Sequence, residues 1–270
     1  MEIHTKIVLA IFLGFILLEI IFTSFFKKPG QRTDDAIVEI FGTISLLFFI
    51  QPFVFLLAYS LADYFLPIYK NYINEWSFLS IFGLFLIFED LTQYWWHRTC
   101  HKVPLLYNLH RPHHDPEYLS IRVVFRNNPL YYFMMPGLWV AGILVYLGAG
   151  WVYAVYVVIK QTVIFGAHSD FRWDEPLYKI KWLSPIMWVI ERTISTPATH
   201  SAHHGKFASD EATHYKGNYG NLLFLWDIIF GTAKITRKYP DRMGVENLPE
   251  ASASYQLLWP IVRAPKPKLD

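Results

Sequence analysis

Histidines at helical spacing are the residues of this sequence that most directly indicate chemistry. Ten of the eleven lie between His97 and His214, and most of these form three clusters with the patterns H-x(3)-H, H-x-x-H-H and H-x-x-H-H. The clustered residues are His97, His101, His110, His113, His114, His200, His203 and His204. At this histidine frequency one H-x-x-H-H pattern is expected about 0.02 times by chance in the chain, so two of them indicate a common role.

The spacing of these clusters predicts metal binding. Residues three or four positions apart share one face of a helix, so each cluster can aim its imidazoles at one point. Imidazole suits iron, zinc, copper and nickel, and nine or more imidazoles exceed the roughly four to six ligands of a single ion. Two metal ions are therefore expected. Structural zinc sites are closed and often include cysteines, whereas this chain has surplus histidines and only Cys100, which favours redox chemistry.

Two histidines stand alone in the same part of the chain. His168 ends an apolar segment and His97 follows another, so both are expected at the same membrane edge. We therefore expect His168 to be the ninth ligand. His214 could be a ligand or a hydrogen-bond donor behind the ligands. The sequence leaves that choice open, and His214 stays outside the predicted ligand set.

Three further residues are expected to support the ligands. Asp90 and Tyr94 precede His97 by seven and three positions, on the same helix face and deeper in the membrane. We expect both to orient imidazole N–H groups, and Asp227 either to accept such a hydrogen bond or to cap a helix. Lys160 lies at a depth close to that of Asp90. Because an unpaired lysine in the bilayer is costly, we expect these two to pair, with the neighbouring glutamate as a substitute.

The composition indicates that these residues are carried by a membrane protein. Of the 270 residues, 53% are hydrophobic and only 17% are charged, which is unlike a water-soluble globule. The net charge of +2, with no Lys/Arg run longer than a pair, excludes a nucleic-acid-binding protein. Five apolar segments are candidate spans: 7–26, 36–66, 78–96, 129–147 and 151–167. Pro52 leaves open whether 36–66 crosses once with a kink or twice as a hairpin.

Loop charges predict the orientation of these spans. Lys27, Lys28 and Arg32 mark the first loop as cytoplasmic, because positive residues are retained on that side. Alternation over five spans then places the polar segments 97–128 and 168–270, with every histidine cluster and the C-terminus, in the cytoplasm. The expected location is a bacterial inner membrane or the endoplasmic reticulum. If 36–66 crossed the membrane twice, the basic first loop and the polar segments would lie on opposite sides. The loop charges therefore favour a single crossing.

The predicted fold class is therefore an all-α integral membrane protein. About five transmembrane helices carry a cytoplasmic helical cap that holds a histidine-ligated di-metal centre. We divide the chain into N-terminal spans (1–76), a catalytic domain (77–235) and an irregular C-terminal strap (236–270). Residues 255–262 of the strap are apolar enough to rest on the membrane surface.

The three histidine clusters resemble the pattern of the fatty acid hydroxylase and sterol desaturase superfamily. The likeness starts at Asp90 and runs through Tyr94 and the clusters to Asn218-Tyr219-Gly220, Trp226-Asp227 and Phe230-Gly231-Thr232. It covers about the last two thirds of the chain, and the first 75 residues match only as hydrophobic spans. Within the superfamily, the chain looks most like the alkylglycerol monooxygenase and bacterial sterol-desaturase-like branches.

The resemblance implies a specific chemistry. Two iron ions, which zinc can replace in recombinant material, would use O2 to hydroxylate or desaturate an unactivated C–H bond of a sterol, fatty acyl or alkyl-ether lipid from the bilayer. The haem-binding His-Pro-Gly-Gly of a fused cytochrome b5 is absent, so a separate cytochrome b5-, ferredoxin- or reductase-like electron donor is expected. The alternative, a membrane metal carrier or sensor, needs ligands along a pore, and no histidine lies inside a predicted span.

Two departures from the family pattern narrow the expectation. Arg126-Asn127-Asn128-Pro129 stands where many relatives have Arg-x-His-Pro, and Arg172 stands where fatty acid 2-hydroxylases place another histidine. A 2-hydroxylase is therefore disfavoured.

Overall fold

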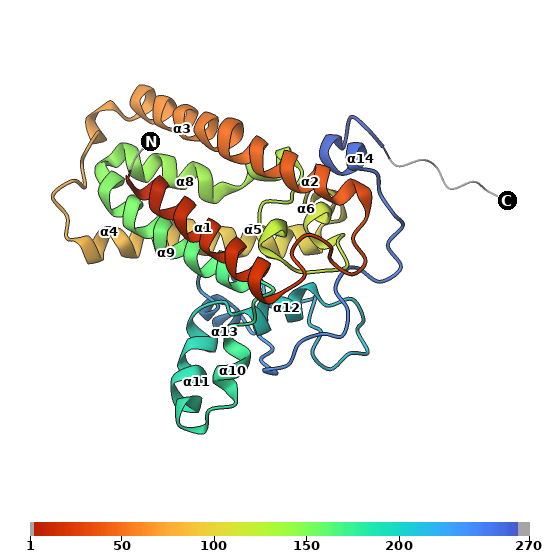
Figure 1. Cartoon of the computed structure of the whole chain (residues 1–270). Coiled ribbons are helices and arrows are strands. Elements are labelled where there is room, and N and C mark those ends of the chain that lie inside the picture. Colours follow the sequence, from red (N-terminus) through yellow and green to blue (C-terminus); the bar gives the residue numbers. More distant parts are fainter. Residues whose placement is uncertain (1–2, 264–270) are drawn as a thin grey trace.

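The structure, a computed structural model, describes residues 3–263, and its regular elements there are all helices apart from two isolated β-bridges (Figure 1). The α-helices are α1 (Ile3–Phe22), α2 (Thr33–Ile44), α3 (Gln51–Phe65), α4 (Phe78–Leu84), α5 (Leu91–Lys102), α6 (Pro104–His114), α7 (Pro129–Met134), α8 (Pro136–Leu144), α9 (Gly150–His168), α10 (Asp174–Tyr178), α11 (Ser184–Thr193), α12 (Pro197–His204), α13 (Leu225–Ile229) and α14 (Ala253–Leu258). The π-helical segments are η1 (Ser45–Ile50), η3 (Phe85–Asp90) and η5 (Val145–Ala149). Short 3₁₀ turns are η2 (Pro67–Tyr69), η4 (Ile121–Val123) and η6 (Lys181–Leu183).

Three continuous helical stretches in the described residues are long and apolar enough to cross a membrane. They are Ile3–Phe22, Thr33–Phe65 and Pro136–His168. The last contains the fifth predicted segment and residues 136–147 of the fourth, joined at a turn, while α7 forms the start of the fourth segment. Residues 78–96 are also helical, in α4, η3 and α5. The all-α prediction is confirmed for residues 3–263, while the number of crossings stays a prediction.

The segment 36–66 forms one long helix, so the hairpin alternative is wrong. Pro52 lies in the first turn of α3, directly after η1. A proline lacks the backbone N–H and crowds the carbonyl four positions earlier, and the wider π-helical register accommodates both. At about 1.5 Å per residue, the 33-residue helix is longer than a ~30 Å hydrocarbon core. Its N-terminal turns therefore extend into the polar cap.

The turn between α8 and α9 lies at the end of the bundle opposite the histidines. Gly148 has a φ of 110°, and a Cβ there would lie 3.1 Å from Asn71 Cα, so both backbone conformation and space require glycine. The amide of Ile73 donates to the Leu147 carbonyl at 2.9 Å, which ties the loop before α4 to this turn. At the same end, the centroid of the His4 ring of α1 lies 6.3 Å from that of the Tyr153 ring of α9, so His4 is far from the other histidines.

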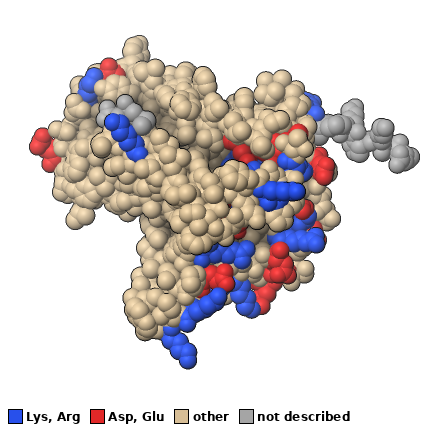
Figure 2. All heavy atoms as spheres, viewed as in Figure 1, with Lys and Arg blue, Asp and Glu red and all other residues tan. Residues whose placement is uncertain are grey.

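The distribution of charge follows the same axis. Charged side chains gather over the loops around the cap, and a few mark the far end of the long helices, with an almost uncharged belt between them (Figure 2). The helices α1 and α9 run side by side along this belt (Figure 1). An apolar belt between two charged rims is the surface expected of a membrane-spanning bundle.

A buried polar cluster joins three helices inside the bundle. The Lys160 ammonium of α9 lies 2.6 Å from both carboxylate oxygens of Glu89 and also donates to Gln93. Tyr156 donates a hydrogen bond to the same carboxylate. The carboxylate also contacts α8, where a Cβ on Gly137 would lie 2.8 Å from Glu89 Oε1. The cluster thus fixes α5, which carries His97, against α9, which carries His168.

The predicted partner of Lys160 was therefore wrong. Asp90 instead accepts hydrogen bonds from the Leu223 amide at 3.2 Å and from Trp226 Nε1 at 2.9 Å. Successive helical residues point about 100° apart, so adjacent carboxylates face different neighbours. Glu89 faces α8 and α9, whereas Asp90 faces α13 and the residues just before it.

We expect Lys160→Met to destabilise the protein by about 3–5 kcal/mol, because it leaves the buried Glu89 carboxylate without its countercharge. Adding Glu89→Gln should restore much of that loss, since a neutral amide needs no countercharge. Unfolding midpoints of both single variants and the double variant in detergent measure the coupling. Strictly additive effects would show that the pair is not coupled.

The described part of the C-terminal strap packs against the cap around α14. Asn128 donates to the carbonyls of Gln256, Leu257 and Trp259 at 3.0–3.2 Å. The Gln256 side chain accepts from Arg126, whose guanidinium is fully buried. Residues 236–263 of the strap are irregular apart from α14 and short turns. Residues 255–257 are buried against the cap, whereas 258–262 include strongly exposed apolar residues. Residues 264–270 lie outside the described part of the chain.

Candidate metal centre

The nine predicted ligands converge on one place at the polar end of the bundle. They come from the end of α5, the second half of α6, the last residue of α9 and the last five residues of α12. The short helix α12 starts with a capping box, in which Thr196 and Thr199 each satisfy the backbone N–H of the other. Pro197 occupies the first helical position, where its missing N–H costs nothing. These signals let only eight residues hold three histidines in a helix.

The ligands form two groups, in each of which one nitrogen atom per histidine lies within 4.8 Å of all the others. The first group is His97, His101, His110, His114 and His203. The second group is His113, His168, His200 and His204.

Helix geometry explains how the clusters divide between the two groups. In a helix, residues i and i+4 lie about 40° apart, whereas i+3 lies about 60° to the other side of i. His110 and His114 therefore enter one group while His113 enters the other. In α12 the arrangement is reversed, because His200 and His204 share the second group and His203 joins the first. Each H-x-x-H-H helix thus contributes to both groups and holds them next to each other.

In three of the histidines a backbone carbonyl holds Nδ1, which identifies Nε2 as the nitrogen that faces the centre of the group. Nδ1 of His97 contacts the Tyr219 carbonyl at 2.7 Å, and Nδ1 of His203 contacts the Gly217 carbonyl at 2.7 Å. The corresponding acceptor for His168 is the Ile164 carbonyl, at 2.8 Å. A carbonyl oxygen only accepts, so Nδ1 carries the proton in each of these rings. The Nε2 lone pair is then free to bind a metal.

The inner nitrogens lie too close together to be stable without a cation or shared protons between them. His203 Nε2 is 3.0 Å from His97 Nε2, and His200 Nε2 is 2.9 Å from His168 Nε2. Nδ1 holds the proton in both His97 and His203, so their contact would bring lone pair against lone pair. A positive ion at the centre of each group removes that repulsion.

Electrostatics favour metal over protons at this site. Burial, with further contributions from neighbouring imidazoles, lowers the pKa of His114 and His204 well below the ordinary value of 6.5. The same two causes lower the pKa of His113, His200 and His203. These rings are therefore neutral at physiological pH, which is the form that binds metal ions.

The donor set fits two redox-active transition-metal ions. Five imidazoles and four imidazoles fall within the four to six ligands usual for such ions and leave coordination positions for oxygen or water. Neither group contains a carboxylate or thiolate among the described residues. Cys100 is buried and packs with Leu109 and Tyr131 in an apolar cluster instead.

The three predicted supporting residues form their hydrogen bonds with other groups than the imidazoles. Asp227 accepts from the amides of Tyr219 and Gly220 at 2.8 and 2.6 Å, and so fixes the turn whose carbonyl orients His97. The Tyr94 hydroxyl contacts Thr232 Oγ1 at 2.9 Å, and Thr232 in turn donates to Asp227. The structure thus differs from the expectation of direct contact with a ligand, and Asp90 bonds instead to Leu223, just before α13, and to Trp226 within it.

His214 lies outside both groups, where its Nε2 is 3.1 Å from the Thr232 carbonyl. Burial lowers the pKa of His214. Its ring is part of the turn that supports the ligands rather than a member of the ligand set.

Asn127 is a supporting residue that the sequence did not single out for this role. Its Oδ1 lies 2.8 Å from His110 Nδ1, and its Nδ2 donates to the Tyr132 hydroxyl at 2.9 Å. The sequence did mark this position, because Arg126-Asn127-Asn128 departs there from the pattern of the family. The remaining acceptors are backbone carbonyls, which leave no mark in a sequence.

We expect Asn127→Leu to lower metal affinity about 10- to 100-fold, because His110 loses the acceptor that fixes its tautomer. Asn127→Asp keeps an acceptor in place and is the matched control. Metal titration with a competing chelator measures both variants. Equal affinity of Asn127→Leu and the unaltered protein would contradict this role.

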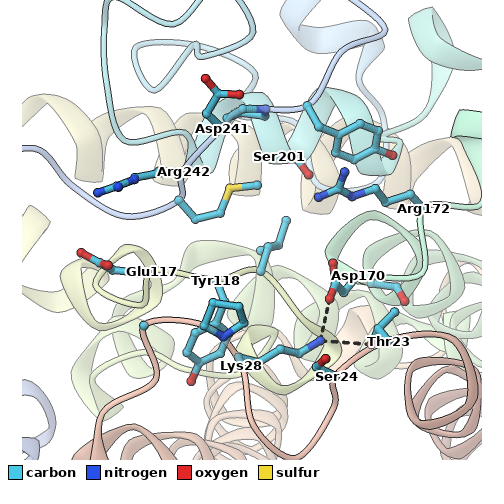
Figure 3. Close-up of a pocket in the computed structure, with 17 residues that line it drawn as sticks. Thr23, Ser24, Lys28, Glu117, Tyr118, Asp170, Arg172, Ser201, Asp241 and Arg242 are labelled. Atoms are coloured by element: carbon cyan, nitrogen blue, oxygen red, sulfur yellow. Dashed lines mark hydrogen bonds and ion pairs between the residues drawn. The ribbon is translucent and has the colours of Figure 1, made fainter.

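A cavity of about 710 Å³ lies beside the second group on the water-facing side. Two of its lining residues, Ser169 and Ser201, directly follow the predicted ligands His168 and His200 in the chain. Lys28 and Asp170 form an ion pair of 2.6 Å along one side, and Ser201 faces them across the open space (Figure 3). The cavity therefore reaches to within one residue of the predicted ligands in the chain.

Comparisons with known proteins agree with this geometry. The family described as "Fatty acid hydroxylase" matches residues 82–232, more than half of the chain. Alkylglycerol monooxygenase from Homo sapiens is 28% identical over 234 residues, which are 82% of this chain and 46% of that protein. The Danio rerio enzyme of the same name is 27% identical over 82% of this chain and 46% of its own length. The chain spans about half the length of these relatives. No solved structure matches.

Proposed function

Because this chain belongs to the fatty acid hydroxylase family, we propose that it is a membrane-embedded, iron-dependent lipid monooxygenase. The observation that carries the proposal is the pair of all-imidazole groups, held side by side by helices that contribute to both. Alkylglycerol monooxygenases are among its relatives, so alkyl-ether lipids are the first substrates to test.

The proposed reaction balances as R–H + O2 + 2 e⁻ + 2 H⁺ → R–OH + H2O. One oxygen atom enters the C–H bond of the lipid, and the other leaves as water. Two iron ions bound by the nine histidines would supply the redox chemistry that activates O2, which amino-acid side chains cannot provide. The two electrons come from a separate donor protein of the cytochrome b5, ferredoxin or reductase type.

The chain's own residues would hold and insulate this centre. The Tyr219, Gly217 and Ile164 carbonyls keep the ligand tautomers fixed, so that Nε2 stays unprotonated throughout turnover. Eight of the nine ligands are buried and His101 is nearly so, which keeps bulk water from the reacting atoms. An apolar bundle next to such a centre suits a lipid chain that arrives from the bilayer.

The cavity beside Ser169 and Ser201 is the proposed site of the lipid's polar head. Its lining combines hydroxyl groups with the exposed guanidinium of Arg172, all on the water-facing side of the ligands. A head held there would leave the hydrocarbon chain directed toward the histidines. Lys27, Lys28 and Arg32 support a cytoplasmic position for this end of the molecule.

Expression in a lipid-rich host with added iron tests the proposal. Mass spectrometry of the lipid extract should reveal species with one added oxygen atom, and the His114→Gln variant should lack them. Species that have lost two hydrogens instead would indicate desaturation. An extract identical to that of the variant would contradict lipid oxidation altogether.

A further inference from the structure

An apolar surface lies outside the long helices, on the small helices that follow the ligand His168. The α10–α11 projection extends away from the bundle, with α13 at its base (Figure 1). Large apolar side chains on these elements are exposed, and two tryptophans are among the most exposed, with Trp182 at 75% and Trp188 at 54%. We call this surface the apolar lobe; its exposed residues are Ile180, Trp182, Ile186, Trp188, Val189, Leu225, Ile228 and Ile229.

The base of the apolar lobe is fixed at membrane depth rather than in the aqueous cap. Leu223 and Trp226 bond to Asp90, which precedes His97 by seven residues and so lies ~10 Å further into the bundle. Leu222 is buried in the same apolar core as Ile81. The segment leading into α13 therefore descends beside α5 to the level of the hydrocarbon-facing core.

The apolar lobe continues the lipid-facing surface of α5 without a break. Trp95 and Phe88 are exposed on the α5 and η3 side of the bundle. The ring of Phe230, directly after α13, lies 5.0 Å from that of Trp95. The helix α11 packs against α13 in turn. A surface that adjoins bilayer-facing residues at the same depth is itself placed to meet lipid.

Basic side chains surround the apolar lobe, as they do on helices that lie at a membrane interface. Lys179, Lys181 and Arg192 flank the apolar face, and the Arg192 guanidinium lies 4.3 Å from the Trp188 ring centroid. The carboxylate within α11, Glu191, is buried and paired with Arg237 at 2.8 Å. In Figure 2 the lower projection is uncharged on one side and carries Lys and Arg at its tip and on its other side. Basic residues around exposed tryptophans are typical of helices at a lipid headgroup layer.

We propose that η6, α11 and α13 insert the apolar lobe into the headgroup and upper acyl region of the leaflet nearest the metal centre. The occupant of this surface is bilayer lipid. The helix α10 packs against α11 and links the lobe to the ligands, because its Asp174 accepts from the Ala198 amide of α12 at 2.9 Å. The cap is thus anchored to the membrane beside the bundle as well as through it.

Fluorescence quenching in lipid nanodiscs tests this insertion. Cys100 is the single cysteine of the sequence, so in a Cys100→Ala background bimane attaches only to introduced cysteines. Label at Val189→Cys should be quenched by lipids brominated near the headgroup about as strongly as label at Leu9→Cys on α1, and should be shielded from aqueous iodide. Label at Lys238→Cys, on the exposed cap, should show the opposite pattern.

Ile186→Cys repeats the measurement on the same face in case one variant folds poorly. Iodide quenching at both positions without bromolipid quenching would overturn the proposal. Protection from both quenchers would also overturn it, because a protein partner would then cover the surface. Neither readout needs turnover, so this inference stands or falls separately from the proposed reaction.

Discussion

His204→Gln is expected to abolish turnover and to lower the metal content from about two ions per chain toward one. The substitution removes one of the four nitrogens of the second group and leaves the first group intact. Substitution of the adjacent residue, His203→Gln, should instead weaken metal binding by the first group, although both residues lie in α12. The loss should exceed the roughly 10- to 100-fold that follows from removing a residue that only supports a ligand. Elemental analysis together with a turnover assay measures both effects.

The matched control is His214→Gln, which changes a histidine in the same region that lies outside both groups. It should retain about two ions per chain and most of the activity, because glutamine keeps a polar side chain next to the Thr232 carbonyl. If His204→Gln bound as much metal as the His214 control, the division into two groups would be wrong.

Exchange of the metal is expected to have an equally large effect. Zinc should fill both groups, because imidazole sites bind Zn²⁺ more tightly than Fe²⁺, yet zinc cannot change its oxidation state. Protein loaded with zinc should therefore have an unfolding temperature at least as high as that of the iron form, and it should have no oxygenase activity. Removal of zinc with a chelator and anaerobic reloading with Fe²⁺ should restore turnover.

Thermal unfolding and turnover of the same samples separate stability from chemistry in this exchange. Cobalt or manganese loading provides a further comparison between ions that occupy similar sites. Activity of the zinc form equal to that of the iron form would contradict a redox role for the centre.

The sequence predicted which histidines lie together, because helical spacing alone places i, i+3 and i+4 imidazoles close to one another. It did not predict how they divide, since His113 and His114 are neighbours whose groups depend on the positions of other helices. The preference for Asp90 over the substitute Glu89 as the partner of Lys160 was wrong for a similar reason. Depth in a helix follows from counting residues, whereas the choice between Glu89 and Asp90 depends on the rotation of α5 against α9.

The segment 222–230 shows another limit of reasoning from span length. It is apolar but much shorter than a membrane crossing, so it was assigned with its surroundings to an aqueous cap. The structure places its first residues against Asp90 inside the bundle. Short apolar segments that enter a membrane from one side can only be located through their tertiary contacts.

Turnover under isotopically heavy O2 tests the central claim most directly. Iron-loaded protein in nanodiscs, supplied with a reductant, a donor protein and an alkyl-ether lipid, is predicted to form a product that carries one heavy oxygen atom derived from O2. The His204→Gln variant should form none under the same conditions. Product oxygen that comes from water, or an oxidised product formed equally by the variant, would contradict a lipid monooxygenase built on these two histidine groups.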